Sequence, residues 1–288
     1  MVLRLLLVSV FLPGLVAGVV AAAARLLPET SRLRRGAPLV ALGAGYVAAH
    51  LAAVGAPSFP PVDTTQALFY LAVVASALGV AAVGGTAWMR RGAAVAAVGS
   101  MLGLTLHPLV RYQWSGSASI FGIVALGLGA VVLWWAYGLL AARVSVTELR
   151  AGWIAVFAST GLLLLFARTA LLAQLASTIA VSSLVVALVA PPAIGADASD
   201  AAALPFLAPM LHALVLNGLF YAELGASAAI VLALAPLAAA VALTVARRGA
   251  TIRVAAATLG VVVLLAPFAA RGAIAYLADD RGYHEYDE

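Results

Sequence analysis

Long apolar runs separated by short polar or charged segments make up almost the whole chain. A helix needs about 20 apolar residues to cross the hydrocarbon core of a bilayer. Five runs in the first half have about this length: Leu5–Ala24, Ala37–Ala56, Ala67–Met89, Ala93–Val110 and Ser119–Ala142. A similar run, Val254–Leu277, lies near the C-terminus. Each of these runs predicts one membrane-spanning helix.

Two further apolar blocks, Ala151–Ala190 and Leu204–Ala246, are each about twice the spanning length. Each contains one formal charge near its middle, Arg168 in the first and Glu223 in the second. Because a charge is costly inside hydrocarbon, the simplest interpretation is that each block forms a helical hairpin with the charged residue at its turn. The predicted fold is therefore an all-α, polytopic transmembrane helical bundle of about ten helices.

Arginine is distributed unevenly between the two sets of loops that these helices define. Eleven of the 16 basic residues fall on one side: Arg25, Arg32, Arg34, Arg35, Arg90, Arg91, Arg143, Arg150, Arg247, Arg248 and Arg253. The opposite side holds Arg4, Arg111, Arg168 and Arg281. Positively charged loops stay in the cytoplasm, so both termini are predicted outside, in a prokaryotic inner membrane. Four tryptophans, which favour interfaces, fall near the predicted cytoplasmic one: Trp88, Trp134, Trp135 and Trp153.

One loop conflicts with this arrangement. Pro191–Pro205 contains Asp197 and Asp200 and no arginine, yet ten helices place it in the cytoplasm. If this loop is outside, the alternative is eight spanning helices plus re-entrant or interfacial segments. In either case residues 1–278 form a single transmembrane domain, and residues 279–288 form a short polar C-terminal tail.

The first apolar run also has features of a signal peptide. Arg4 precedes it, and small residues at positions 21–24 follow, where a peptidase could cut. Cleavage there would leave Arg25, Arg32, Arg34 and Arg35 facing outward, against the positive-inside rule. We therefore predict that this helix is retained.

Composition independently places the chain in lipid. Hydrophobic residues make up 65% and charged residues 9% of the 288 residues, against about 25% charged in an average soluble domain. Too few polar residues remain to cover a wet surface, which excludes a cytosolic enzyme, a nucleic-acid-binding domain and a disordered chain. The sequence contains no cysteine and no lysine. Disulfides, thiolate metal sites, lysine Schiff bases and the P-loop are therefore excluded within this chain.

Six ionisable residues at or near membrane depth gather toward the predicted outer side: His50, His107, Arg111, Arg168, Glu223 and Arg271. Charged side chains at such depth usually face a cavity or a partner. The pattern predicts an outward-facing pocket, basic overall, with Glu223 as the counter-charge, for a small anionic solute or a lipid headgroup. The alternative is that the arginines extend to phosphate headgroups and that Glu223 caps a turn.

The most specific prediction concerns Glu223 and Arg271. Both are flanked by apolar sequence, and an unpaired charge in hydrocarbon costs roughly 2.5–3.5 kcal/mol on insertion scales. Pairing or shared hydration would reduce that cost. We therefore predict that the two side chains lie on one inward-facing surface, with His50 or His107 nearby.

Two histidines at similar predicted depth, His50 and His107, are the arrangement that a bis-histidine b-type haem requires. Neither has a second histidine on its own helix, which a two-haem subunit would show. His212, with Asn217 and Tyr221 further along the same helix, is interpreted as hydrogen-bonding within the bundle. The sequence predicts no metal site and no cofactor, and a b-type haem held by His50 and His107 is only the alternative to that prediction.

Small residues predict tight helix packing. Gly14 and Gly18, and also Gly99 and Gly103, have the Gly-x-x-x-Gly spacing that lets two backbones approach closely. In an alanine-rich chain such pairs also arise by chance. They therefore predict close contacts without identifying the partner helices.

The preferred function is a transporter-like carrier of a small anionic solute or lipid, embedded in the bilayer and without a nucleic-acid partner. The runner-up is a non-catalytic membrane subunit that scaffolds a larger complex, and the third is the haem-binding subunit. No Ser/His, Asp-rich or His/Glu cluster indicates catalysis, so no catalytic residue is predicted. The length and helix number resemble those of ten-helix transporters of the drug/metabolite type. This resemblance is one of architecture and implies no residue roles.

Overall fold

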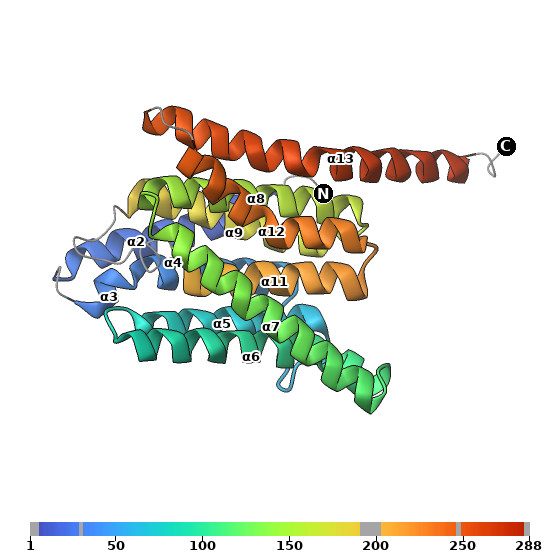
Figure 1. Ribbon diagram of the computed structural model, residues 1–288, viewed down its shortest axis with the longest axis horizontal. Helices are drawn as coiled ribbons and strands as arrows, with labels where there is room; N and C mark the ends of the chain where they lie inside the picture. The colour runs from blue at the N-terminus through green and yellow to red at the C-terminus, as the bar shows by residue number, and fades with distance from the viewer. Residues whose placement is uncertain (1–5, 29–30, 191–202, 246–248, 285–288) are drawn as a thin grey trace.

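The computed structural model describes residues 6–28, 31–190, 203–245 and 249–284, which fold into helices with no β-strand among them (Figure 1). A π-helical turn, Leu7–Phe11, leads into α2, and a 3₁₀ turn, Ala24–Leu26, follows it. The helices are α2 (Leu12–Ala23), α3 (Arg32–Arg35), α4 (Ala37–Ala53), α5 (Thr64–Ala82), α6 (Ala87–Tyr112), α7 (Gly116–Ala141), α8 (Val146–Phe166), α9 (Ala170–Val189), α11 (Leu204–Tyr221), α12 (Ala226–Val245) and α13 (Ala250–His284).

Within the described ranges, nine helical stretches are long and apolar enough to cross a membrane, and α4 is a shorter apolar helix of 17 residues. The predicted all-helical architecture is confirmed, and it is compatible with a multi-pass membrane protein. Both long apolar blocks are divided into two helices, α8 with α9 and α11 with α12, as predicted. The loop with Asp197 and Asp200, which would separate ten spans from eight, lies outside the described residues, as do Arg4, Arg247 and Arg248.

Successive long helices run in opposite directions, so their connections gather at two ends of the molecule (Figure 1). We call one the glutamate end; it is formed by residues 54–63, 113–115, 167–169 and 222–225. We call the other the arginine end; it is formed by residues 24–36, 83–86 and 142–145, the C-terminus of α9 and the N-terminus of α11. Among the residues that the structure describes, the two sets of arginines distinguished in the sequence therefore lie at opposite ends.

Helix α11 is the centre of the bundle. It is the most buried of the long helices, and it packs against α5, α6 and α12. Its large apolar side chains, among them Phe206, Met210 and Leu214, are completely buried. Helices α7 and α13 are the most exposed. Figure 1 shows α7 crossing the bundle diagonally, while α13 lies along its top edge in this view, where it packs on α8 and α12.

Polar residues fix where three of the helices begin. The Asp63 side chain accepts a hydrogen bond from the Gln66 backbone N–H at the start of α5, at 2.7 Å. Thr86 caps α6 in the same way. At α8, Ser145 and Glu148 form a reciprocal capping box. Each cap satisfies backbone N–H groups that have no partner within their own helix.

The turn between α5 and α6 corrects one predicted boundary. The apolar pattern predicts a helix from Ala67 to Met89, but α5 ends at Ala82. Gly84 adopts a left-handed conformation with φ +66°, which glycine tolerates best, and the new helix then begins. Arg90 and Arg91 consequently lie inside α6 rather than in a loop.

Only some of the close glycine contacts match the predicted pairs. A methyl group added to Gly14 or Gly18 of α2 would lie 3.3 Å and 3.1 Å, respectively, from a valine side chain of α9. Gly99 and Gly103 of α6 have nothing within 4 Å. Helix α4 instead approaches a neighbouring backbone closely at Gly45, where an added methyl would lie 2.9 Å from the Pro13 carbonyl oxygen.

Candidate functional site

Helices α4, α6, α8 and α11 all end at the glutamate end (Figure 1), and the sequence puts five of the six predicted site residues near those helix ends. The sixth, Arg271, lies on α13, where the neighbouring Gly272 packs on Phe166 at the end of α8. Their environments differ. His50 of α4 is fully buried, whereas the remaining five are exposed: His107, Arg111, Arg168, Glu223 and Arg271. The six residues therefore share one end of the molecule, and Arg168 among them lines the cleft described below.

Arg168 and Glu223, at the turns of the two hairpins, form an ion pair. The Arg168 Nε and Glu223 Oε2 atoms lie 3.5 Å apart, and the side chains are 46% and 69% exposed. Such exposed pairs contribute only about 0–1 kcal/mol. The pair therefore connects the α8–α9 and α11–α12 turns without locking them.

Beside this ion pair lies a cleft of about 360 Å³. We call it the end cleft. Its lining comes from the start of α5, the α8–α9 turn, the start of α9 and the end of α11: Thr64, Thr65, Arg168, Thr169, Ala170, Leu171, Leu172, Asn217 and Tyr221. Arg168 is the only formally charged residue in this lining. The volume lies in the range of small-molecule sites, about 300–1,000 Å³.

The amino end of α9 faces this cleft without a side-chain cap. Thr169 is its N-cap residue, but the Thr169 hydroxyl donates to the Leu164 carbonyl oxygen at 2.8 Å. The first-turn amides of a helix have no acceptor within that helix, and they carry the positive end of its dipole. Together with the Arg168 guanidinium, they make this wall of the end cleft suited to an anion.

Asn217 forms the inner wall of the end cleft. It is 1% exposed, and its Nδ2 donates to the Ala213 carbonyl oxygen at 2.8 Å. Its Oδ1 is buried and has no hydrogen-bond partner among the described residues. A buried acceptor without a partner is unfavourable by about 1–3 kcal/mol. A ligand donor that reached Oδ1 would remove this penalty.

Tyr221 holds the same wall in place. Its hydroxyl donates to the Thr105 carbonyl oxygen of α6 at 2.8 Å, which ties the end of α11 to a neighbouring helix. His212, on the same helix, has its Nδ1 2.8 Å from the Ala208 carbonyl oxygen. His212 is thus hydrogen-bonded as predicted, but its bond and that of Asn217 stay within α11, whereas the Tyr221 bond reaches α6.

Arg271 and Glu223 form no ion pair with each other within the described part of the chain. Glu223 pairs with Arg168 instead. Gly272, next to Arg271, packs on Phe166 at the end of α8, so Arg271 lies near the same hairpin turn. Arg111 stacks over the Tyr112 ring with 5.4 Å between its guanidinium carbon and the ring centroid.

His50 lies in an aromatic environment rather than in the end cleft. Its ring centroid is 6.0 Å from that of Tyr46 and 5.4 Å from that of Phe69. Both ring nitrogens are buried without a hydrogen-bond partner in the described residues. His107 is exposed on α6. The absence of a cofactor stays a prediction, and ligation of a b-type haem by His50 and His107 stays its alternative.

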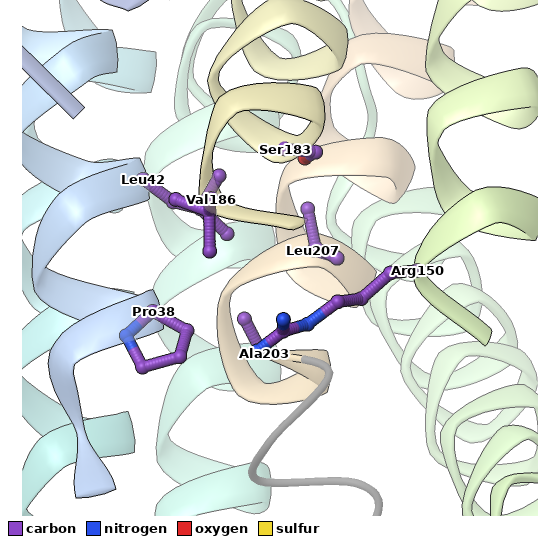
Figure 2. Close-up of a pocket in the computed structure, with 7 residues that line it drawn as sticks. All are labelled: Pro38, Leu42, Arg150, Ser183, Val186, Ala203 and Leu207. Atoms are coloured by element: carbon purple, nitrogen blue, oxygen red, sulfur yellow. The ribbon is translucent and has the colours of Figure 1, made fainter. Parts of the chain in front are cut away.

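A second polar position inside the bundle is Arg150, at the arginine end (Figure 2). The side chain is buried, and its Nη1 donates to the Ala190 carbonyl oxygen at 2.6 Å. Arg25 likewise donates to the Val189 carbonyl oxygen. Two guanidinium groups thus bind the carboxyl end of α9, where the helix dipole favours cations. The cavity that Arg150 lines is about 10 Å³, room for roughly one water, and it is too small for a solute.

No protein-family model, no curated protein and no solved structure matches this chain. The resemblance in length and helix number to drug/metabolite-type transporters therefore assigns no residue a role. The functional conclusion has to come from the end cleft and its side chains.

Sequence reasoning finds Arg168 of the end cleft and its ion-pair partner Glu223, but it names Asn217 and Tyr221 only as residues near His212 and does not find the threonines. Thr169 follows the charged residue of the first hairpin, and Asn217 precedes that of the second by less than two helical turns. A search for polar residues next to each charged turn would have found both. The packing that brings the two turns together has no counterpart in the local pattern.

Proposed function

We propose that this chain is a multi-pass membrane protein that binds a small anionic solute in the end cleft and carries it across the bilayer. The observation that carries the proposal is the composition of this cleft: the Arg168 guanidinium and the uncapped amino end of α9 lie together in one concave site. Half-helix amino ends that point at an anionic substrate group are a recurring device in membrane carriers.

Glu223 gives the site a way to exchange anions. Its carboxylate forms a weak, solvent-exposed ion pair with the Arg168 guanidinium. A solute anion that reaches Arg168 replaces Glu223 as the partner. Asn217 Oδ1 on the inner wall then favours solutes that also carry a hydrogen-bond donor, such as a hydroxyl or an ammonium group.

Anion binding is testable by thermal unfolding of the purified protein in detergent. The sodium salts of phosphate, sulfate, acetate, succinate and glutamate are compared with sodium chloride at equal ionic strength. We expect at least one of them to raise the unfolding temperature, because a ligand that binds the folded state stabilises it by RT ln(1 + [L]/Kd). Arg168→Gln should abolish that shift, whereas Glu223→Gln should enlarge it because the competing carboxylate is gone.

Arg111→Gln is the matched control, since Arg111 is also an exposed arginine at the glutamate end but does not line the end cleft. It should respond to the anions as the wild type does. An equal response in the Arg168 and Arg111 variants, or no response to any salt, would exclude the site. The anion that passes this test is then assayed for uptake into proteoliposomes.

The proposed orientation places the arginine end in the cytoplasm of a prokaryotic cell and both termini outside. Reporter fusions after Arg91 and after Arg248 should read cytoplasmic, and a fusion after Asp63 should read external. A fusion within residues 197–200 should read cytoplasmic for ten spans and external for eight. An external result after Arg248 would contradict both arrangements.

One observation favours a second function, as a non-catalytic subunit of a larger membrane complex. Helix α13 continues to His284 and extends beyond the neighbouring helices in Figure 1. In this alternative the extension is a contact for a partner subunit. Native mass spectrometry of protein extracted in mild detergent should then show a stoichiometric partner, which is lost when the chain is truncated after Ala275.

A further inference from the structure

A second hollow lies at the arginine end, on the outer surface between α6 and α7. We call it the α6–α7 groove, and its volume is about 540 Å³. Arg90 and Arg91 lie at its arginine-end rim, and apolar or aromatic residues line the rest: Ala87, Ala94, Val95, Val98, Val131, Trp134, Trp135, Gly138, Leu139 and Leu204. It shares no residue with the end cleft.

The groove is open toward the surroundings of the bundle. Val95, Val131, Trp135 and Leu139 are between 41% and 68% exposed. A methyl group added to Gly138 would meet nothing within 4 Å. The groove is therefore an apolar surface furrow that is open on its outer side. In a membrane, that side faces lipid.

The rim of the groove is positively charged, in contrast to its apolar walls. Arg90 and Arg91 lie in the first two turns of α6, near the positive end of the helix dipole, and the first turn contains no acidic residue. Arg90 Nη1 donates to the Gly85 carbonyl oxygen at 3.1 Å, and the Arg91 guanidinium carbon lies 5.7 Å from the centre of the Trp88 ring. Two cations at the amino end of a helix repel its dipole, and an anion between them would relieve that repulsion.

A charged rim above an apolar channel matches an amphiphile with an anionic head and a hydrocarbon tail. We propose that the α6–α7 groove binds an anionic phospholipid, with its phosphate at Arg90 and Arg91 and one acyl chain along Val95, Val131 and Leu139. Tryptophans beside the rim fit this depth, because indole rings favour the boundary between headgroups and hydrocarbon. Basic pockets between helices on the cytoplasmic side are suited to anionic headgroups. The site is separate from the proposed solute site and does not depend on it.

The test counts lipids on the purified full-length chain by native mass spectrometry after incubation with phosphatidylglycerol or phosphatidylcholine. We expect the wild type to retain more phosphatidylglycerol. Gly138→Leu should displace the acyl chain and remove most of this retention, without disturbing the fold, because its side chain enters open space. Gly129→Leu is the matched control: it lies on the same helix in equally open surroundings, outside the groove, and should retain lipid as the wild type does.

The headgroup is tested separately. Arg91→Gln should reduce the preference for phosphatidylglycerol by about fivefold, the effect of roughly one basic residue near a membrane surface. Arg168→Gln should leave lipid retention unchanged, which separates this site from the end cleft. Equal retention of both lipids, or equal retention by the Gly138 and Gly129 variants, would overturn the proposal. Displacement of phosphatidylglycerol by millimolar inorganic phosphate would also overturn it, in favour of a small-anion site.

Discussion

Replacing Glu148 with alanine should destabilise the protein by about 3 kcal/mol, the lower end of the 3–5 kcal/mol typical for breaking a buried ion pair. The Glu148 side chain is 1% exposed, and its Oε1 lies 2.7 Å from Nη2 of Arg253 on α13. Its Oε2 also accepts from the Ser145 backbone N–H at 3.0 Å. Alanine removes both contacts. The lower value applies because Arg253 is 34% exposed, so water partly solvates the remaining cation.

A double-mutant comparison separates charge from packing. Glu148→Met and Arg253→Met should each destabilise strongly, but the double variant should be more stable than Glu148→Met, because no unpaired charge remains. Glu148→Gln should recover about 1 kcal/mol relative to alanine, since glutamine also completes a capping box. The measurement is reversible unfolding in mixed micelles. Additive losses in the double variant would refute the ion pair as the origin of the effect.

Gly45→Val should destabilise the protein by about 3 kcal/mol or more, at the upper end of what overpacking usually costs. An added Cβ would lie 2.6 Å from Ser182 Oγ and 2.9 Å from the Pro13 carbonyl oxygen. The hydroxyl can rotate away, but the carbonyl belongs to the backbone of α2. Valine therefore forces α2 and α4 apart, and the contact of both helices with α9 is lost with it.

Gly103→Val serves as the comparison, because Gly103 also lies inside a long helix but has nothing within 4 Å. We expect it to change stability by no more than about 0.5 kcal/mol, as for most surface substitutions. Thermal unfolding followed by size-exclusion chromatography distinguishes the two. Similar unfolding temperatures for both variants would contradict the close approach of α2 and α4.

The division of the chain into helices could be predicted because hydrocarbon penalises charge so strongly. Arg168 and Glu223 interrupt long apolar blocks, and both lie at turns in the structure. The boundary between α5 and α6 could not be predicted from hydrophobicity, since Val83 and the two glycines after it carry no charge and continue the apolar pattern of the helix. The residue types mark this boundary instead. Gly84 favours the left-handed conformation that follows the end of α5, and Thr86 caps the start of α6.

The site could be predicted only in part. The hydrophobic pattern along the chain indicates how deep a residue lies in the membrane, but not toward which neighbours its side chain points. His50 and Arg168 are both predicted toward the outer side of the membrane, yet His50 lies in an aromatic cluster and Arg168 borders the end cleft. The pairing of Arg168 with Glu223 joins residues far apart in the sequence. Arg150 is predicted in a loop, but it is buried at the end of α9 because that helix end needs donors for its carbonyl groups.

The length of α13 has a geometric consequence for how the protein meets the membrane. Its 35 residues correspond to a rod of about 52 Å at 1.5 Å per residue. A rod tilted by roughly 40°, the upper end of the usual range, needs only about 39 Å to traverse a 30 Å hydrocarbon core. Tilting alone therefore cannot bring all of α13 into the hydrocarbon core. Two or more of its turns must lie in the headgroup layer or beyond it. A protease or antibody directed at those turns would reach them in sealed vesicles from whichever side they protrude.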